Sequence, residues 1–193
     1  MEKEWINESN TVLVGICKRR TNDYRDYKLL MNLVGNSSEY SIQPDLLKKA
    51  ATELVKQLQP RKMPDYIVGL AAAGIPITIA VSYETGIPAI IAYKFRLDLP
   101  NELSWREPHC VDDNFYLYGL KKRQSVIIID DEVDSGNTLI NAIEVLSCNG
   151  IEIVDIGCIV EVVSREGMPS KDRLSKYGFT LKSLLKVELI SES

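Results

Sequence analysis

The chain has 193 residues, 45% of them hydrophobic, and a formal net charge of −4 at pH 7. This length and composition predict one α/β domain with a well-buried core, and the acidic balance argues against nucleic acid or a membrane surface as a partner. The start, MEKEWINESN, lacks the apolar stretch of a targeting segment, and no run reaches the roughly eighteen apolar residues of a spanning helix, so a cytoplasmic protein is expected.

The first half of the chain predicts short strands followed by a helix and a strand. Residues 1–43 show little periodicity and suggest short strands, with a loop at 36–39. The stretch 44–58, PDLLKKAATELVKQL, places its apolar residues at helical spacing, and its proline suits a first turn. Residues 65–70, DYIVGL, then predict a short buried strand.

A second helix and strand follow, and an irregular segment comes after them. AAAGIPITIAVSYETG predicts a helix that ends at Gly86, and IPAIIAYK predicts another buried strand. Residues 95–119 carry no sustained period and are too long for an ordinary connection, so a flexible lid is expected there.

The second half repeats the alternation of strand and helix. SVIIID predicts a third strand, SGNTLINAIEVLSCNG a helix, and IEIVDIGCIVEV a fourth strand, with a small loop-and-strand appendage at the C-terminus. Unbroken apolar strands that alternate with helices predict a parallel sheet covered on both faces. Ligands of such sheets bind at the carboxyl ends of the strands.

Residues 126–138, VIIIDDEVDSGNT, carry the clearest chemical signal. A buried strand leads into Asp130 and Asp131, and a Ser-Gly-Asn-Thr turn opens the next helix. Backbone N–H groups of such a turn and the helix dipole bind an anion, while the two carboxylates can accept hydrogen bonds from ribose hydroxyls. The pattern indicates recognition of a phosphorylated sugar.

Other motifs fail on spacing. Counted from Asp130, the glycine of an EF-hand loop would fall one position late. Gly69 to Gly74 has the glycine spacing of a P-loop but Ile75 and Pro76 replace its Lys-Ser/Thr pair. The four cysteines show no C-x-x-C spacing and the chain has one histidine, so no zinc site is expected.

VIIIDDEVDSGNT resembles the phosphoribosyl-pyrophosphate (PRPP) loop of type I phosphoribosyltransferases. Residues 65–94 are similar to the pyrophosphate-loop region of orotate and adenine phosphoribosyltransferases, and the C-terminal segment resembles the end of the adenine enzymes. The resemblance implies an α/β parallel sheet flanked by helices, with one domain over residues 1–193. Its core would span about 44–163, and residues 1–43 and 164–193 would form a small hood.

The resemblance also implies roles for individual residues. Asp130 and Asp131 would hold the ribose hydroxyls and help to place Mg²⁺. PRPP would also contact Asp134, Ser135, Gly136, Asn137 and Thr138. Pyrophosphate would meet the loop of Ala71, Ala72, Ala73 and Gly74, with Lys94 as a nearby cation. Asp134, together with Arg106 or Glu107 from the lid, would complete the catalytic site.

The implied activity is transfer of a phosphoribosyl group from Mg-PRPP to a nucleobase by a homodimer. Asp134 stands where hypoxanthine-type enzymes have an acid near the purine ring, and a 6-substituted purine such as adenine is the first expectation. Orotate is the alternative base. Ala71 and Ala73 replace the charged residues that adenine-type enzymes carry, which keeps open a PRPP-binding regulator without turnover.

Overall fold

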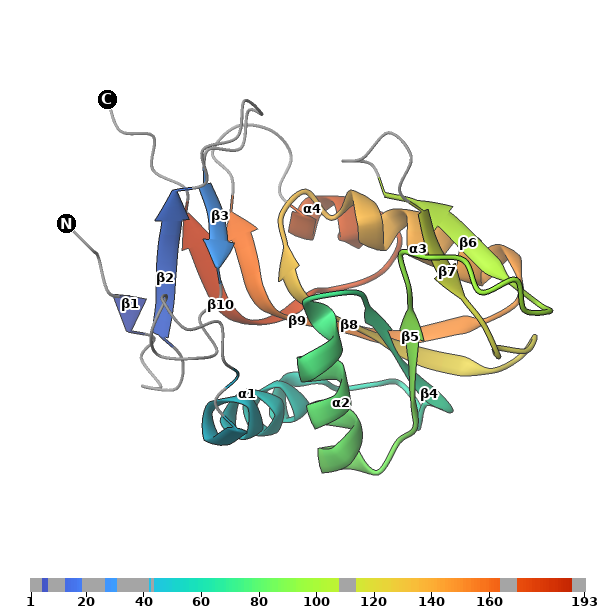
Figure 1. Cartoon of the computed structure of the whole chain (residues 1–193), viewed down its shortest axis with the longest axis horizontal. Helices are drawn as coiled ribbons and strands as arrows, with labels where there is room; N and C mark the ends of the chain where they lie inside the picture. Colours follow the sequence, from blue (N-terminus) through green and yellow to red (C-terminus); the bar gives the residue numbers. More distant parts are fainter. Residues whose placement is uncertain are drawn as a thin grey trace.

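Five parallel strands form the central sheet, in the order β10-β9-β8-β4-β5 (Figure 1). The structure, a computed structural model, describes residues 5–6, 13–18, 27–30, 42, 44–107, 114–163 and 170–188. The strands are β4 (Tyr66–Leu70), β5 (Ala89–Ala92), β8 (Ser125–Val133), β9 (Glu152–Val163) and β10 (Lys182–Glu188). The parallel pairing confirms the fold class expected from the unbroken apolar runs.

Helices cover both faces of this sheet. The first face packs against α1 (Pro44–Gln57) and α2 (Gly74–Thr85), and the second against α3 (Asn137–Cys148) and α4 (Ser170–Ser175). Along β8, Ile127 and Ile129 belong to the first apolar layer, whereas Val126 and Ile128 belong to the second. Successive side chains of a strand point to opposite faces, so every apolar residue of β8 is buried against helices.

Close packing between β4 and α2 explains a glycine in the strand. A Cβ atom at Gly69 would lie 2.3 Å from Oγ1 of Thr78, so no larger residue fits without moving the helix. Thr78 in turn donates a hydrogen bond of 2.7 Å to the carbonyl oxygen of Gly74. The glycine spacing that resembled a P-loop therefore serves the packing of α2 on the sheet.

The irregular stretch within residues 95–119 contains a β-hairpin that the sequence pattern did not predict. β6 (Leu103–Arg106) and β7 (Asn114–Leu117) pair antiparallel, and Trp105 pairs with Phe115. Trp105, Phe115 and Leu117 are buried in the layer that contains α3. The described strands of this segment are thus part of the core, while residues 108–113 lie outside the described residues.

The N-terminal part contains the short strands that were expected. β1 (Trp5–Ile6), β2 (Leu13–Lys18) and β3 (Tyr27–Leu30) form an antiparallel sheet of their own. The loop expected at 36–39 lies outside the described residues. At the other end of the chain, a loop-and-strand appendage was expected. The structure instead has α4 there, and the strand β10 belongs to the central sheet, next to β9. Across the described ranges, no helix is long and apolar enough to cross a membrane.

Candidate active site

The order in which the chain adds strands to the sheet reverses between β4 and β8. The expected site residues converge at this point. From β4 the chain passes through α2 to β5 on one side, whereas β8 leads through α3 to β9 on the other. In open α/β sheets, ligands bind outside the carboxyl ends of the strands at such a switch point. The loop after β4 and the turn after β8 are therefore neighbours at the same edge of the sheet.

The acidic end of β8 is electrostatically strained. Asp130 and Asp131 follow five buried residues of the strand, and the backbone N–H of Asp131 donates to Oδ1 of Asp130 at 3.0 Å. Desolvation, together with the negative charges of Asp131 and Glu132, raises the pKa of Asp130 well above its usual range. A cation or a hydroxyl donor bound at this edge would relieve that cost, so the pair suits a ribose with Mg²⁺ nearby.

The N-terminus of α2 touches the acidic pair. A Cβ atom at Gly74 would lie 2.9 Å from Oδ1 of Asp130 and 3.5 Å from the backbone nitrogen of Asp131. Only a glycine lets the helix start this close to the tip of β8. The structure thus brings together the expected pyrophosphate loop and the expected ribose-binding carboxylates.

The pyrophosphate loop itself presents backbone rather than side chains. Ala71 donates its N–H to the carbonyl oxygen of Ala92 at 3.0 Å, which joins the loop to the end of β5. Ala72 and Ala73 are exposed, and the peptide bond between Ala71 and Ala72 is cis. Helix α2 begins directly after Ala73, so the partial positive charge of its N-terminus lies beside the loop.

The turn after β8 has the backbone shape of an anion-binding nest. Gly136 caps α3 with φ 75°, a left-handed conformation that glycine adopts readily. The N–H of Asn137 donates to Oγ of Ser135 at 3.4 Å, and no acidic residue occupies the first turn of α3. Asp134 and Thr138 flank this turn and are partly exposed. The geometry suits a phosphate group at the helix N-terminus.

Lys94 has a different environment from the one expected of a pyrophosphate ligand. Its ammonium group forms an ion pair with Glu107 and lies 5.2 Å from the centre of the Phe115 ring. The side chain of Glu107 is 17% exposed, so this contact is partly shielded from water. Two expected site residues, one for pyrophosphate and one for catalysis, are therefore partners of each other in the structure.

Arg106 lies at the end of β6, beside α3. Its carbonyl oxygen accepts a hydrogen bond of 2.8 Å from Nδ2 of Asn141, and its side chain is exposed. This contact fixes the hairpin to the helix whose N-terminus forms the nest. Asn141 was not singled out in the sequence, because its partner comes from a hairpin that the pattern did not reveal.

A further residue beside the nest was missed. Arg173 on α4 donates a hydrogen bond of 2.6 Å from Nη1 to Oδ1 of Asn137. No local pattern marks this contact, since α4 was not expected and the two residues are 36 positions apart. On β9, Cys158 pairs in register with Asp130. Burial raises the pKa of the Cys158 thiol well above its ordinary value, which disfavours the reactive thiolate.

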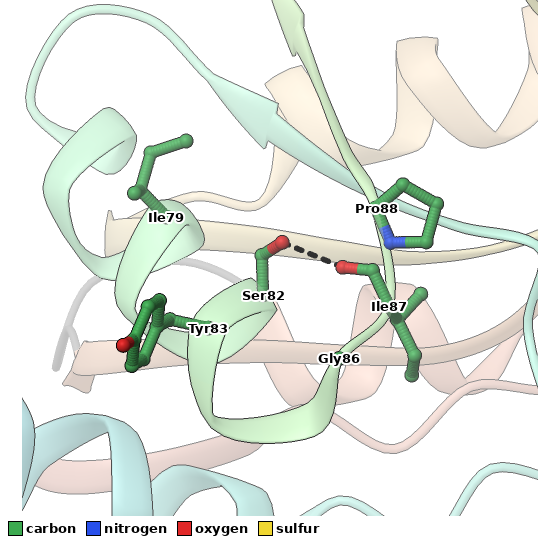
Figure 2. A pocket seen from close by; sticks show the side chains of 6 residues that line it. All are labelled: Ile79, Ser82, Tyr83, Gly86, Ile87 and Pro88. Carbon is green, nitrogen blue, oxygen red and sulfur yellow. Dashed lines mark hydrogen bonds between the residues drawn. The ribbon is translucent and has the colours of Figure 1, made fainter.

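An apolar depression elsewhere on the surface is not part of this site. It is lined by Ile79, Ser82, Tyr83, Gly86, Ile87 and Pro88, where α2 ends and β5 begins (Figure 2). Oγ of Ser82 donates to the carbonyl oxygen of Ile87 at 2.6 Å across it. These residues lie at the amino end of β5, opposite to the edge where α/β sheets bind their ligands.

Comparison with known protein families shows to which family the chain belongs. The phosphoribosyl transferase domain matches residues 37–179. The chain belongs to this family. The matched range of this phosphoribosyltransferase covers every candidate residue named above, Arg173 included.

Individual relatives of this phosphoribosyltransferase differ in the base that their names give. It is 31% identical to the hypoxanthine/guanine phosphoribosyltransferase of Methanothermobacter thermautotrophicus over 149 residues, 77% of this chain and 74% of that protein. The adenine phosphoribosyltransferase structure from Rhodothermus marinus has a TM-score of 0.63 with 15% identity, and the match covers 93% and 96% of the two chains. At that identity the likeness shows the fold alone.

A third similar protein, known from a solved structure, is named for a pyrimidine nucleotide. The structure of Leishmania donovani UMP synthase matches with a TM-score of 0.60 and 25% identity, over 89% of this chain and 33% of that one.

Proposed function

We propose that the chain transfers a 5-phosphoribosyl group from Mg-PRPP to a purine base and releases pyrophosphate. The observation that carries this proposal is the contact between Gly74 and Asp130, which places two helix N-termini and an acidic pair at one switch point. PRPP has the complementary groups, namely a phosphate, vicinal hydroxyls and a pyrophosphate. A single domain over residues 1–193, with the terminal segments as a hood, remains part of this proposal.

Three groups of residues would each bind one part of PRPP. The turn of residues 135–138 would hold the 5′-phosphate, Asp130 and Asp131 the ribose hydroxyls, and residues 71–74 the pyrophosphate. The carboxylates offer the hard oxygen ligands that Mg²⁺ prefers, and Mg²⁺ usually binds to one or two carboxylates together with substrate phosphates. When bound, Mg²⁺ would neutralise charge on the leaving pyrophosphate.

In the reaction, the bond from C1′ to pyrophosphate breaks and a bond from C1′ to a ring nitrogen of the base forms. The base loses one proton, and the carboxylate of Asp134 is our candidate acceptor. Catalysis of this kind depends on position and charge stabilisation rather than on a covalent intermediate. Of the expected lid at 95–119, residues 95–102 remain our candidate, because β6 and β7 belong to the core. Phe95, Leu97 and Leu99 expose apolar side chains that could close over a bound base.

The base is tested with a panel of hypoxanthine, guanine, adenine and orotate, incubated with Mg-PRPP and assayed for pyrophosphate release. We expect hypoxanthine and guanine to react fastest. Asp134 supplies the acid that the resemblance to hypoxanthine-type enzymes places near the base, and the 31% identical relative is named for these two bases. Adenine, the first expectation from sequence, would come second. Orotate is in the panel because it is the alternative base expected from the sequence.

Each result of the panel points to a different function. Turnover of orotate without purine turnover would refute the purine assignment and leave the PRPP site intact. Tight Mg-PRPP binding without turnover of any base would identify a regulator instead of an enzyme with this substrate range.

We also propose a homodimer in which the depression of Figure 2 is covered by a second copy. Helix α2, GIPITIAVSYET, has apolar residues on all sides, and such a helix is normally buried on all sides. Tyr83 is nevertheless 92% exposed and Ile79 50% exposed. A second α2 would bury both.

The dimer is tested by sedimentation of a double variant, Ile79→Glu with Tyr83→Glu. We expect the wild type to sediment as a dimer and the variant as a folded monomer, because two charges would be desolvated in the interface. Met63→Glu is the matched control, since Met63 is also exposed, at 74%, but lies outside the depression. A wild-type monomer would contradict the proposal.

A further inference from the structure

Lys94 lies just beyond the point where the pyrophosphate loop is joined to β5. The carbonyl oxygen of Ala92, the last residue of β5, accepts the hydrogen bond from the N–H of Ala71. Tyr93 then exchanges two backbone hydrogen bonds with Tyr116 of β7, at 2.9 and 2.7 Å, which join the end of β5 to the hairpin (Figure 1). The backbone of Lys94 is therefore held at the same edge of the sheet as the pyrophosphate loop.

The ammonium group of Lys94 contacts an aromatic ring and a carboxylate. It lies 5.2 Å from the centre of the Phe115 ring and forms an ion pair with Glu107. Phe115 is 3% exposed and stacks on Trp105. Glu107 directly follows β6, whose last residue accepts a hydrogen bond from a side chain of α3. The carboxylate is thus presented to Lys94 by a hairpin that is fixed in the core.

The lysine, unlike the hairpin, can turn toward a second partner. Its side chain has a flexible stem and three N–H donors, and it is 37% exposed, so an anion from solution can approach it. Residues 71–73 of the pyrophosphate loop are alanines and bring no charge of their own. A pyrophosphate bound at this loop would attract Lys94, and it would compete with the carboxylate of Glu107 for the same cation.

We propose that Glu107 is an internal competitor of pyrophosphate, an inference that rests on the proposed function. Its carboxylate pairs with Lys94 when no pyrophosphate is bound, and it weakens the binding of pyrophosphate by the free energy needed to break that ion pair. Glu107 acts through Lys94 and is a positioning residue rather than a catalytic one. Because release of product limits the rate of many enzymes, this competition favours the departure of pyrophosphate after transfer.

The experiment is calorimetric titration of the full chain with Mg-pyrophosphate, Mg-PRPP and ribose 5-phosphate. Glu107→Gln keeps the size of the side chain and removes its charge. It should strengthen the binding of Mg-pyrophosphate and Mg-PRPP by roughly fivefold, the upper end of the range for exposed ion pairs. The affinity for ribose 5-phosphate should not change, because this ligand lacks the pyrophosphate.

A double-mutant cycle separates competition for Lys94 from simple repulsion between Glu107 and the ligand. Lys94→Met removes the cation and keeps an unbranched side chain, and Lys94→Gln replaces it if that variant does not fold. In either background, Glu107→Gln should change the affinity for Mg-PRPP by less than about twofold, because no cation is left to compete for. Mg-PRPP is the ligand for this cycle, since its ribose and 5′-phosphate contacts keep the binding measurable.

Glu102→Gln is the matched control. The side chain of Glu102 is 17% exposed, as that of Glu107 is, and it pairs with a cation of its own, Arg96, at 2.8 Å. Glu102 directly precedes β6, so this variant removes one negative charge from the same hairpin. It should leave all three affinities unchanged.

The outcomes distinguish this inference from the function on which it rests. If the wild type binds neither Mg-pyrophosphate nor Mg-PRPP, the proposed function is wrong. If the wild type binds both, and Glu107→Gln binds them equally or more weakly, the role of Glu107 is wrong and the function stands. A fivefold gain that persists without Lys94, or an equal gain from Glu102→Gln, would also refute that role, because either would show a general effect of negative charge.

Discussion

Replacing Asp130 and Asp131 with asparagine will remove Mg-PRPP binding and leave the protein folded. Each carboxylate would accept hydrogen bonds from ribose hydroxyls, and a charged hydrogen bond contributes about 1.5–3 kcal/mol. Loss of both corresponds to a decrease in affinity of about 10²- to 10⁴-fold. Calorimetric titration of the double variant with Mg-PRPP measures this loss directly.

The same double variant should be more stable than the wild type. Desolvation and the neighbouring carboxylate raise the pKa of Asp130, so the folded chain takes up a proton there more readily than the unfolded chain. The contribution of Asp130 to the free energy of unfolding is therefore largest below its unfolded pKa of about 4, and it is lost as pH rises through the folded pKa. Asparagine cannot be charged and therefore removes this penalty, so urea unfolding above pH 4 or so should show a higher midpoint for the double variant than for the wild type.

Asp65 provides the matched control at the opposite end of the same two strands. Its Oδ2 accepts hydrogen bonds from the backbone nitrogen and the hydroxyl of Ser125, at 2.7 and 2.9 Å. These bonds lower the pKa of Asp65, so Asp65→Asn should reduce stability above pH 4 or so and leave Mg-PRPP binding intact. Unchanged Mg-PRPP affinity in the Asp130 and Asp131 variant would show that the ribose lies elsewhere.

Trp105→Ala should destabilise the protein by about 3–5 kcal/mol, as other large aromatic truncations in cores do. Trp105 is 4% exposed and stacks on Phe115 with ring centres 5.6 Å apart. Because β6 also positions Arg106 and Glu107, the variant should lose phosphoribosyl transfer as well. Urea unfolding gives the free energy, and pyrophosphate release gives the activity.

Trp105→Phe tests whether the apolar packing accounts for this effect. Nε1 of Trp105 is buried without a hydrogen-bond partner among the described residues, so phenylalanine loses no hydrogen bond. We expect this variant to cost less than half as much as Trp105→Ala. A loss below about 1 kcal/mol for Trp105→Ala would mean that the hairpin is not part of the core. Hydrogen exchange of β6 and β7 without ligand gives an independent check, with strong protection expected in both strands.

The elements of the central sheet could be predicted because each has its own local signal. The apolar run before Asp130 and the left-handed Gly86 after α2 mark a strand and a helix end without reference to distant residues. The acidic pair and the turn after it belong to one continuous stretch of chain. Their closeness follows from the strand-turn-helix geometry, so this half of the candidate site was visible in the sequence.

Contacts between distant segments were not visible. Trp105 and Phe115 alternate with less buried residues over strands of only four residues each, too short for a clear period. The ion pair of Lys94 with Glu107 depends on that hairpin and was missed with it. Arg173 reaches Asn137 only because Leu174 docks a six-residue helix on α3, and no local pattern encodes that docking.

Helices α2 and α3 lie on opposite faces of the sheet, so the separation of their N-termini would set the length of a donor that binds to both. One helix N-terminus rises to the carboxyl edge from each face, and the two adjacent strands from which they start, β4 and β8, lie about 4.8 Å apart. A sugar that is phosphorylated at both ends can straddle the edge and reach both helices at once. A sugar with a phosphate at one end would reach only one of them, so the proposed site would select its donor by length as well as by the contacts of Asp130 and Asp131.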